Sequence, residues 1–188
     1  MNRYRDVWML QMLGREMRMV DAQIVAALQN GTAFFASTSL IAVGGALTLL
    51  RSTNEILEVV AALPFGVTTT QVQWEAKTMG LAIIFVYAFF KFGWAYRLYN
   101  YVAIMVGATP PAKEQDTPEA KAHAERLGRL CEVAGRHFNR GQRAFFFALG
   151  YLGWFISPWV LMVTSVVVAI VPWRRQFASD SRQALIGK

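Results

Sequence analysis

Residues 22–50 read AQIVAALQNGTAFFASTSLIAVGGALTLL and contain no charged side chain. As an α-helix, which rises about 1.5 Å per residue, this stretch is long enough to cross a hydrocarbon core of about 30 Å. Residues 78–106 are largely apolar and are interrupted only by Lys91 and Arg97, and residues 144–173 carry no charge. We therefore predict an all-α, polytopic membrane protein with about three transmembrane helices.

The composition agrees with a membrane location. Of the 188 residues, 55% are hydrophobic, and the formal net charge is +7. Each Lys or Arg near an anionic membrane surface contributes about 1 kcal/mol of attraction, so this charge favours contact with anionic lipids. Because the cations are spread over several segments without a recognition motif, nucleic acid is not an expected partner.

Polar segments separate the apolar stretches and divide one membrane domain, residues 1–188. We expect an interfacial helix over 1–28, transmembrane helices over 29–50, 78–106 and 144–173, a periplasmic connection over 51–77, a cytoplasmic helical arm over 107–143 and a basic tail over 174–188.

The N-terminal segment has the pattern of an amphipathic helix. Its apolar residues recur every three or four positions, at Met9, Leu13, Met17, Val20, Ile24 and Leu28, and arginines supply a basic side. This pattern is typical of a helix that lies in the membrane interface. The same stripe is also compatible with packing on the protein's own helices.

The last apolar stretch is longer than one crossing requires, since 144–173 would span about 45 Å as one helix. Ser157 and Pro158 mark the expected kink. A re-entrant hairpin is the alternative to one kinked crossing.

The distribution of Lys and Arg predicts the orientation. Four lie in 1–30 and seven in 107–143, against two in 51–77 and four in 174–188. Because cytoplasmic segments are enriched in Lys and Arg, we place the first two segments in the cytoplasm of a bacterium and the helices in its inner membrane. A re-entrant last segment would also return the tail to the cytoplasm.

Lys91 and Arg97 are the candidate contact residues, because a cation within a membrane helix is costly and therefore informative. The aromatic residues Trp94 and Tyr101 lie beside them in sequence. We interpret these four as lipid- or partner-contact candidates, with snorkelling to lipid phosphates as the main interpretation and a substrate pathway as the alternative.

The first membrane helix is rich in small residues. Helices in lipid associate by close backbone approach, which small side chains permit. Ser37, Ala42, Gly44 and Gly45 are therefore the helix-packing candidates.

The sequence contains no pattern of a catalytic, cofactor or metal site. No carboxylate lies within the apolar stretches, and a single cysteine, Cys131, matches no metal or haem signature. His123 and His137 would lie about 21 Å apart along one helix, too far to share a metal. We expect no enzyme and no cofactor.

Several motifs resemble one known family. They are Ala36-Ser37-Thr38, FFKFGWAYRLYNY at 89–101, FNRG at 138–141, GYLGWF at 150–155 and RRQF at 174–177. The chain resembles domain-of-unknown-function family 599, multi-pass membrane proteins of bacteria and plants, and fits its bacterial branch. Members of that family usually carry one more membrane helix before the segment that begins here at Met1, so the resemblance implies that this helix is missing. The family implies no activity.

Together these observations predict a non-catalytic accessory or scaffolding subunit of a larger inner-membrane complex, respiratory or photosynthetic. Its expected partners are other membrane protein subunits and anionic lipids. The alternative is a small oligomeric transporter or channel for an anionic solute or lipid.

Overall fold

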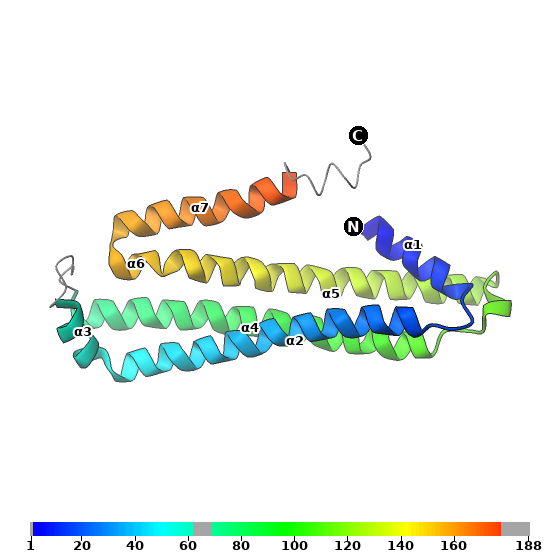
Figure 1. The fold of residues 1–188 in the computed structure, drawn as a ribbon, viewed down its shortest axis with the longest axis horizontal. Helices are drawn as coiled ribbons and strands as arrows, with labels where there is room; N and C mark the ends of the chain where they lie inside the picture. Colours follow the sequence, from blue (N-terminus) through cyan, green and yellow to red (C-terminus); the bar gives the residue numbers. More distant parts are fainter. Residues whose placement is uncertain (1, 62–68, 178–188) are drawn as a thin grey trace. The chain divides into compact units, whose positions relative to one another are not determined.

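The computed structural model describes residues 2–61 and 69–177, and within these ranges all regular structure is helical (Figure 1). The prediction of an all-α fold is confirmed. The helices are α1 (Asn2–Leu13), α2 (Met19–Arg51), α3 (Thr53–Ala61), α4 (Gln71–Gly107), the 3-10 turn η1 (Ala112–Glu114), α5 (Pro118–Tyr151), α6 (Gly153–Ile156) and α7 (Pro158–Phe177).

Two helices are long and apolar enough to cross a membrane. These are α2, with 33 residues, and α4, with 37 residues. The apolar part of α7, Pro158–Ile170, is shorter than a full crossing. Two of the three predicted membrane stretches therefore correspond to helices of membrane-spanning length among the described residues.

Local capping residues fix where α4 and α5 begin. Thr70 and Gln73 form a reciprocal capping box, with both backbone-to-side-chain contacts at 3.3 Å. At α5, Thr117 Oγ1 accepts a hydrogen bond from the backbone N–H of Ala120 at 3.2 Å, and Pro118 occupies the first helical position. Both helices therefore begin at residues whose side chains satisfy the first backbone N–H groups.

The N-terminal segment is two helices and not the single helix expected over 1–28. Helix α1 ends at Leu13 and α2 begins at Met19. The predicted stripe is divided accordingly: Met9 is fully buried, whereas Met17 is 75% exposed. The chain turns here because side chains of α1 and of the turn bind the start of α2 through a buried aspartate described below. Of the two interpretations of the apolar stripe, packing on the protein's own helices holds for α1, whose residues Met9, Met12 and Leu13 lie in the core of unit 1.

The described residues form two compact units, and each is described by itself. Unit 1 contains the residues up to Thr38 together with Phe89–Gly141. Its apolar core joins α1, the first part of α2, the second part of α4 and the first part of α5. The buried members are Met9, Met12, Leu13, Val25, Val102, Val106, Ala120, Ala124, Leu127 and Cys131.

Three aromatic rings join the three long helices within unit 1. Phe92 of α4 stacks on Phe35 of α2 with ring centroids 5.3 Å apart, and Phe138 of α5 meets Phe92 edge-on at 5.6 Å. Gln29 of α2 also donates a hydrogen bond to Asn100 of α4 at 2.5 Å. These contacts fix the register of α4 against α2 and α5 within unit 1.

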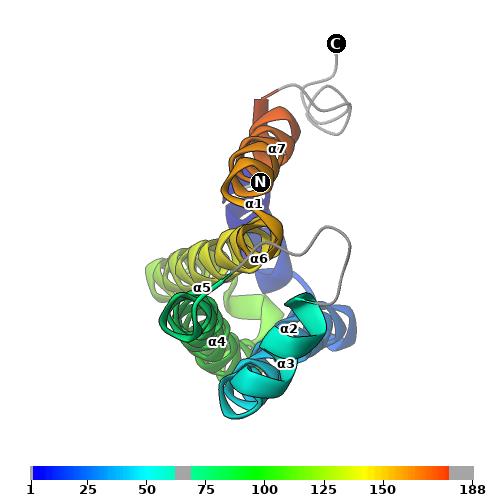
Figure 2. The ribbon, with the colours of Figure 1, turned by 90° about the vertical axis from the view of Figure 1, so that its left-hand side faces the viewer.

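Unit 2 contains Ser39–Ala88 and the residues from Gln142 onward. Its core is formed by Leu81, Phe85 and Ala148, and it is flanked by Ala42, Val43, Ile84, Phe145, Tyr151 and Phe155. Within this unit, α7 lies on the side of α5 that faces away from α2 and α4 (Figures 1 and 2).

The segment 144–173 differs from the single kinked helix that we expected. Helix α5 continues past residue 143 to Tyr151, and the chain reverses at Ser157, which is extended with φ −164° and ψ 160°. The residue before a proline disfavours helical geometry, so Pro158 explains the break. Helix α7 then returns beside the end of α5, where Thr164 Oγ1 donates a hydrogen bond to the Gly150 carbonyl at 2.7 Å. The end of α5, α6 and α7 therefore form a hairpin, as in the alternative to one kinked crossing.

The buried faces of the three long helices follow a seven-residue repeat. On α2 the buried positions include Val25, Thr32, Ser39 and Ala46; on α4 they include Thr78, Phe85, Phe92, Tyr99 and Val106; on α5 they include Ala120, Leu127, Ala134, Gly141 and Ala148. A seven-residue repeat keeps one seam of each helix facing its neighbours, as in coiled coils. Each of these helices therefore has a defined inner face and a defined outer face.

Candidate functional site

Three of the four contact candidates on α4 come together around the guanidinium of Arg97. Its Nε donates a hydrogen bond to the Tyr101 hydroxyl at 2.7 Å, and its Cζ lies 5.7 Å from the ring centroids of both Trp94 and Tyr101. Trp94 is 50% exposed and Tyr101 is 41% exposed, so this face of α4 points away from the core of unit 1. Cation–π contacts of this kind hold an arginine in place without neutralising its charge.

Helix α5 adds a histidine to this surface. The ring centroids of Trp94 and His137 lie 6.4 Å apart. The two helices approach closely here, because a Cβ atom added at Gly141 would lie only 2.7 Å from the Phe92 ring. His137 is half-buried and its Nδ1 is a buried atom without a hydrogen-bond partner.

Burial and nearby cations both affect the protonation of His137. Burial lowers the pKa of His137 below its usual 6.5, and the charges of Lys91, Arg140 and Arg136 lower this pKa further. Each of these cations therefore disfavours the protonated imidazole. Lys91 comes from α4, whereas Arg136 and Arg140 come from α5, so two helices contribute.

Carboxylates neutralise only part of this charge. Arg136 forms an ion pair with Glu132 at 2.6 Å. In the described part of the chain, neither Arg97 nor Arg140 has a carboxylate within ion-pair distance. We call Lys91, Trp94, Arg97, Tyr101, His137 and Arg140 the basic aromatic surface. Its chemistry suits an anionic group such as a phosphate, which charged N–H donors bind strongly.

A second polar cluster lies at the turn between α1 and α2. Asp21 is fully buried, and its Oδ1 accepts hydrogen bonds from Trp8 Nε1 at 2.7 Å and from Arg15 Nη1 at 2.6 Å. Its Oδ2 is buried without a hydrogen-bond partner. The carboxylate occupies the first turn of α2, where the helix dipole favours negative charge. This cluster holds α1 against α2 within unit 1.

Arg18 and His123 bind carbonyl groups at and just after the end of α4. Arg18 donates hydrogen bonds to the carbonyls of Thr109, at 2.8 Å, and Pro110, at 2.5 Å. His123 Nε2 lies 3.0 Å from the Met105 carbonyl. Carbonyls at a helix end have no partner within the helix, so these contacts satisfy them. We assign both side chains a structural role.

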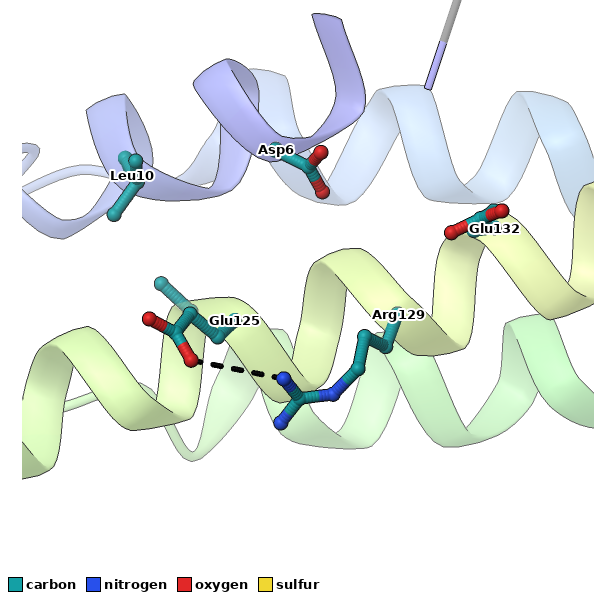
Figure 3. A pocket seen from close by; sticks show the side chains of 6 residues that line it. Asp6, Leu10, Glu125, Arg129 and Glu132 are labelled. Atoms are coloured by element: carbon teal, nitrogen blue, oxygen red, sulfur yellow. Dashed lines mark ion pairs between the residues drawn. The ribbon is translucent and has the colours of Figure 1, made fainter. Parts of the chain in front are cut away.

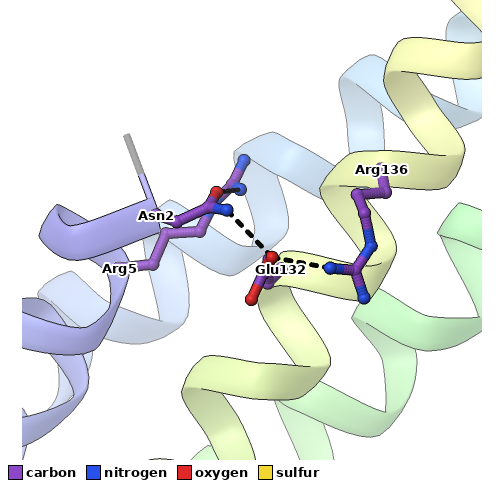
Figure 4. Close-up of polar contacts among 4 residues, drawn as sticks. All are labelled: Asn2, Arg5, Glu132 and Arg136. Carbon is purple, nitrogen blue, oxygen red and sulfur yellow. Dashed lines mark hydrogen bonds and ion pairs between the residues drawn. The ribbon is translucent and has the colours of Figure 1, made fainter.

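A shallow pocket of about 270 Å³ lies between α1 and α5 in unit 1 (Figure 3). It is lined by Asp6, Leu10, Ala124, Glu125, Arg129 and Glu132. Glu125 pairs with Arg129 at 3.6 Å, and Glu132 accepts hydrogen bonds from Asn2 at 2.9 Å and from Arg136 at 2.6 Å (Figure 4). Two of the three carboxylates thus serve helix contacts, and the pocket is a groove where α1 rests on α5.

Cys131 lies in the core of unit 1 and is 1% exposed. Burial raises the pKa of its thiol to about 11. The thiolate is the nucleophilic form, so this cysteine is inert at neutral pH.

The structure separates the four helix-packing candidates on α2. Ala42 packs against the core of unit 2. Ser37, Gly44 and Gly45 are exposed, and a Cβ atom added at either glycine would meet no other atom within 4 Å.

Sequence reasoning found the α4 half of the basic aromatic surface and missed the α5 half. Lys91 and Arg97 were detectable because cations are rare in an apolar stretch. His137 and Arg140 lie in a charged segment, where nothing in the sequence distinguishes them from solvated residues.

The fold defines an all-α protein with two helices of membrane-spanning length. The model of the family described as "Protein of unknown function, DUF599" matches residues 1–181, so the chain belongs to this family. The resemblance seen in the motifs is thereby confirmed. No curated protein and no solved structure matches the chain.

Proposed function

We propose that this protein is a non-catalytic accessory or scaffolding subunit of a larger complex, respiratory or photosynthetic, in a bacterial inner membrane. The observation that carries the proposal is the outer face of α2. This helix is of membrane-spanning length, yet only 11% of its most apolar window is buried within the protein. A helix so little covered has surface available for other membrane subunits.

The outer face of α2 has the same repeat as its inner face. The exposed positions Asn30, Ser37 and Gly44 are spaced by seven residues, and Phe34, Ile41 and Thr48 lie between and beyond them. Ile41 is 75% exposed and Phe34 is 66% exposed. Small residues at Ser37 and Gly44 beside large ones at Phe34 and Ile41 provide holes and knobs for a partner helix. We call Asn30, Phe34, Ser37, Ile41, Gly44 and Thr48 the outer seam.

The proposed membrane position follows from the same surfaces. With α2 and α4 crossing the bilayer, the protein is multi-pass, and the segments around α1 and the first half of α5 supply the positive charge expected in the cytoplasm. Anionic lipids are then the second class of partner, in contact with the basic aromatic surface.

Native purification in a gentle detergent tests the proposal. The wild type is expected to migrate with larger membrane subunits, and the double substitution Ser37→Leu with Gly44→Leu is expected to release it. Leucine favours insertion but prevents close helix approach, so the released protein should remain in the membrane. The matched control is Val59→Leu with Val72→Leu, which adds bulk at exposed positions of α3 and α4, outside the outer seam.

The alternative is a small oligomeric transporter or channel for an anionic solute or lipid. It makes the opposite prediction in the same experiment. A wild type that runs as a homo-oligomer, with no other subunit attached, favours the transporter and contradicts the accessory role.

A further inference from the structure

We propose that the basic aromatic surface of α4 and α5 is a specific binding site for the phosphate of an anionic phospholipid. This inference deepens the proposed contact with anionic lipids and rests on the proposed membrane position of α4, but not on the accessory role. It would stand even if the protein had no partner subunit.

The cations of this surface are held in place before any ligand arrives. Arg97 is fixed by its hydrogen bond to Tyr101 and by the two aromatic rings beside it. Holding a long side chain in one geometry costs conformational entropy, and here contacts within the protein have already supplied that ordering. The guanidinium therefore keeps its charge and loses little freedom when a phosphate binds.

Helix α5 adds His137 and Arg140 to the aromatic and basic residues of α4, so the surface contains more than one cation. The ring centroids of Trp94 and His137 lie 6.4 Å apart. Arg140 lies about one turn beyond His137 on α5. Burial lowers the pKa of His137, and the charges of Lys91, Arg140 and Arg136 lower it further. Bringing several cations together costs free energy through mutual repulsion, and an anion placed among them relieves it.

Exposure favours a lipid over a free solute as the occupant. Trp94 and Tyr101 are half-exposed on the outside of unit 1, so a ligand is approached from the surroundings of α4 and not from an internal cavity. Amphipathic Trp and Tyr rings prefer the headgroup level of a bilayer, and Lys and Arg reach headgroups from within a membrane helix. The surface therefore combines aromatic anchors with phosphate-binding cations on the outside of unit 1.

Native mass spectrometry of the purified full-length protein tests the site. The probes are phosphatidylcholine vesicles with and without phosphatidylglycerol, and inorganic phosphate alone. The wild type is expected to retain phosphatidylglycerol, and Arg97→Gln with Arg140→Gln is expected to reduce this retention about tenfold or more, because two charge-assisted contacts are lost. The matched control is Arg3→Gln with Arg126→Gln, which removes the same charge from exposed positions of unit 1.

Each outcome decides the proposal. Retention lost only in the site variant supports it, and equal loss in the control variant overturns it in favour of general charge attraction. Competition by inorganic phosphate at comparable concentration overturns the lipid as occupant. The single substitution Arg140→Gln is not expected to disturb folding, because Arg140 is exposed and has no carboxylate partner in the described chain. Unchanged phosphatidylglycerol retention in this variant contradicts the site.

Discussion

His137 is the residue whose protonation reports on the basic aromatic surface. Its pKa is lowered by burial and by the surrounding cations, so the neutral imidazole is favoured in the folded protein. A lowered folded-state pKa contributes stability that is present above the unfolded value of about 6.5 and is lost as pH falls from that value toward the folded pKa. Acidification through this range therefore destabilises unit 1 around α4 and α5.

Removing one nearby charge should move this pKa in a known direction. Lys91→Gln takes away a cation that disfavours the imidazolium, so the pKa of His137 should rise toward 6.5. The pH titration of the His137 ring signals by NMR measures this shift. Lys121→Gln, an exposed change near the start of α5, serves as the control and should leave the pKa unchanged. A His137 pKa that stays fixed in Lys91→Gln contradicts the arrangement.

The N-terminal turn shows why single residues escaped the sequence analysis. Asp21 is the last charge before an uncharged stretch, which suggests the end of a membrane segment and nothing more. Its burial depends on Trp8 and Arg15, whose positions depend in turn on where the chain bends. Hydrophobic periodicity continues across that bend from Leu13 to Met17, so the pattern predicted one helix where the polar contacts make two.

At the level of elements, a pair of glycines tests the packing of α4 on α5. A Cβ atom at Gly141 would meet the ring of Phe92, which is fully buried between Phe35 and Phe138 and cannot move aside. Gly141→Ala should therefore cost about 1–3 kcal/mol by overpacking. Gly93 has open space, so Gly93→Ala should be neutral or stabilise by about 0.5–1 kcal/mol through helix propensity.

Thermal unfolding of both variants in the same detergent compares these effects. Gly93→Ala is the control for detergent and expression. Equal stability of the two alanine variants would show that α4 and α5 do not approach as described.

The helices themselves were predictable to a useful degree, and their ends were less so. The caps at Thr70 and Thr117 are local, because each involves residues only three positions apart. The continuation of α5 from 143 to Tyr151 was not visible, because a change from charged to apolar residues resembles a membrane boundary. The return of α7 depends on contacts between distant residues, such as Thr164 with the Gly150 carbonyl.

At the level of the whole molecule, the reversal at Ser157 changes the expected topology. Because α7 returns beside the end of α5, we predict that the chain after α7 reaches the cytoplasmic side of the membrane. In this predicted topology Arg51 and Lys77 are the cations expected on the opposite side, which agrees better with the enrichment of positive charge in the cytoplasm.

Cysteine labelling of intact cells tests this topology. An impermeant reagent should react with Thr69→Cys but not with Glu119→Cys or Ser181→Cys. The native Cys131 is buried and provides no background. Labelling of Ser181→Cys from outside would restore a full third crossing, and labelling of Glu119→Cys would reverse the orientation.

The central claim, that the outer seam of α2 binds another membrane subunit, is tested most directly by photocrosslinking in native membranes. A photoreactive residue replaces Ile41 on the outer seam, and a second variant carries it at Ala46, which is fully buried on the inner face. We predict that the probe at Ile41 crosslinks to a different membrane polypeptide, whereas the probe at Ala46 reacts only within the chain. Crosslinks from Ile41 to lipid alone, or only to a second copy of this protein, would contradict the accessory-subunit account.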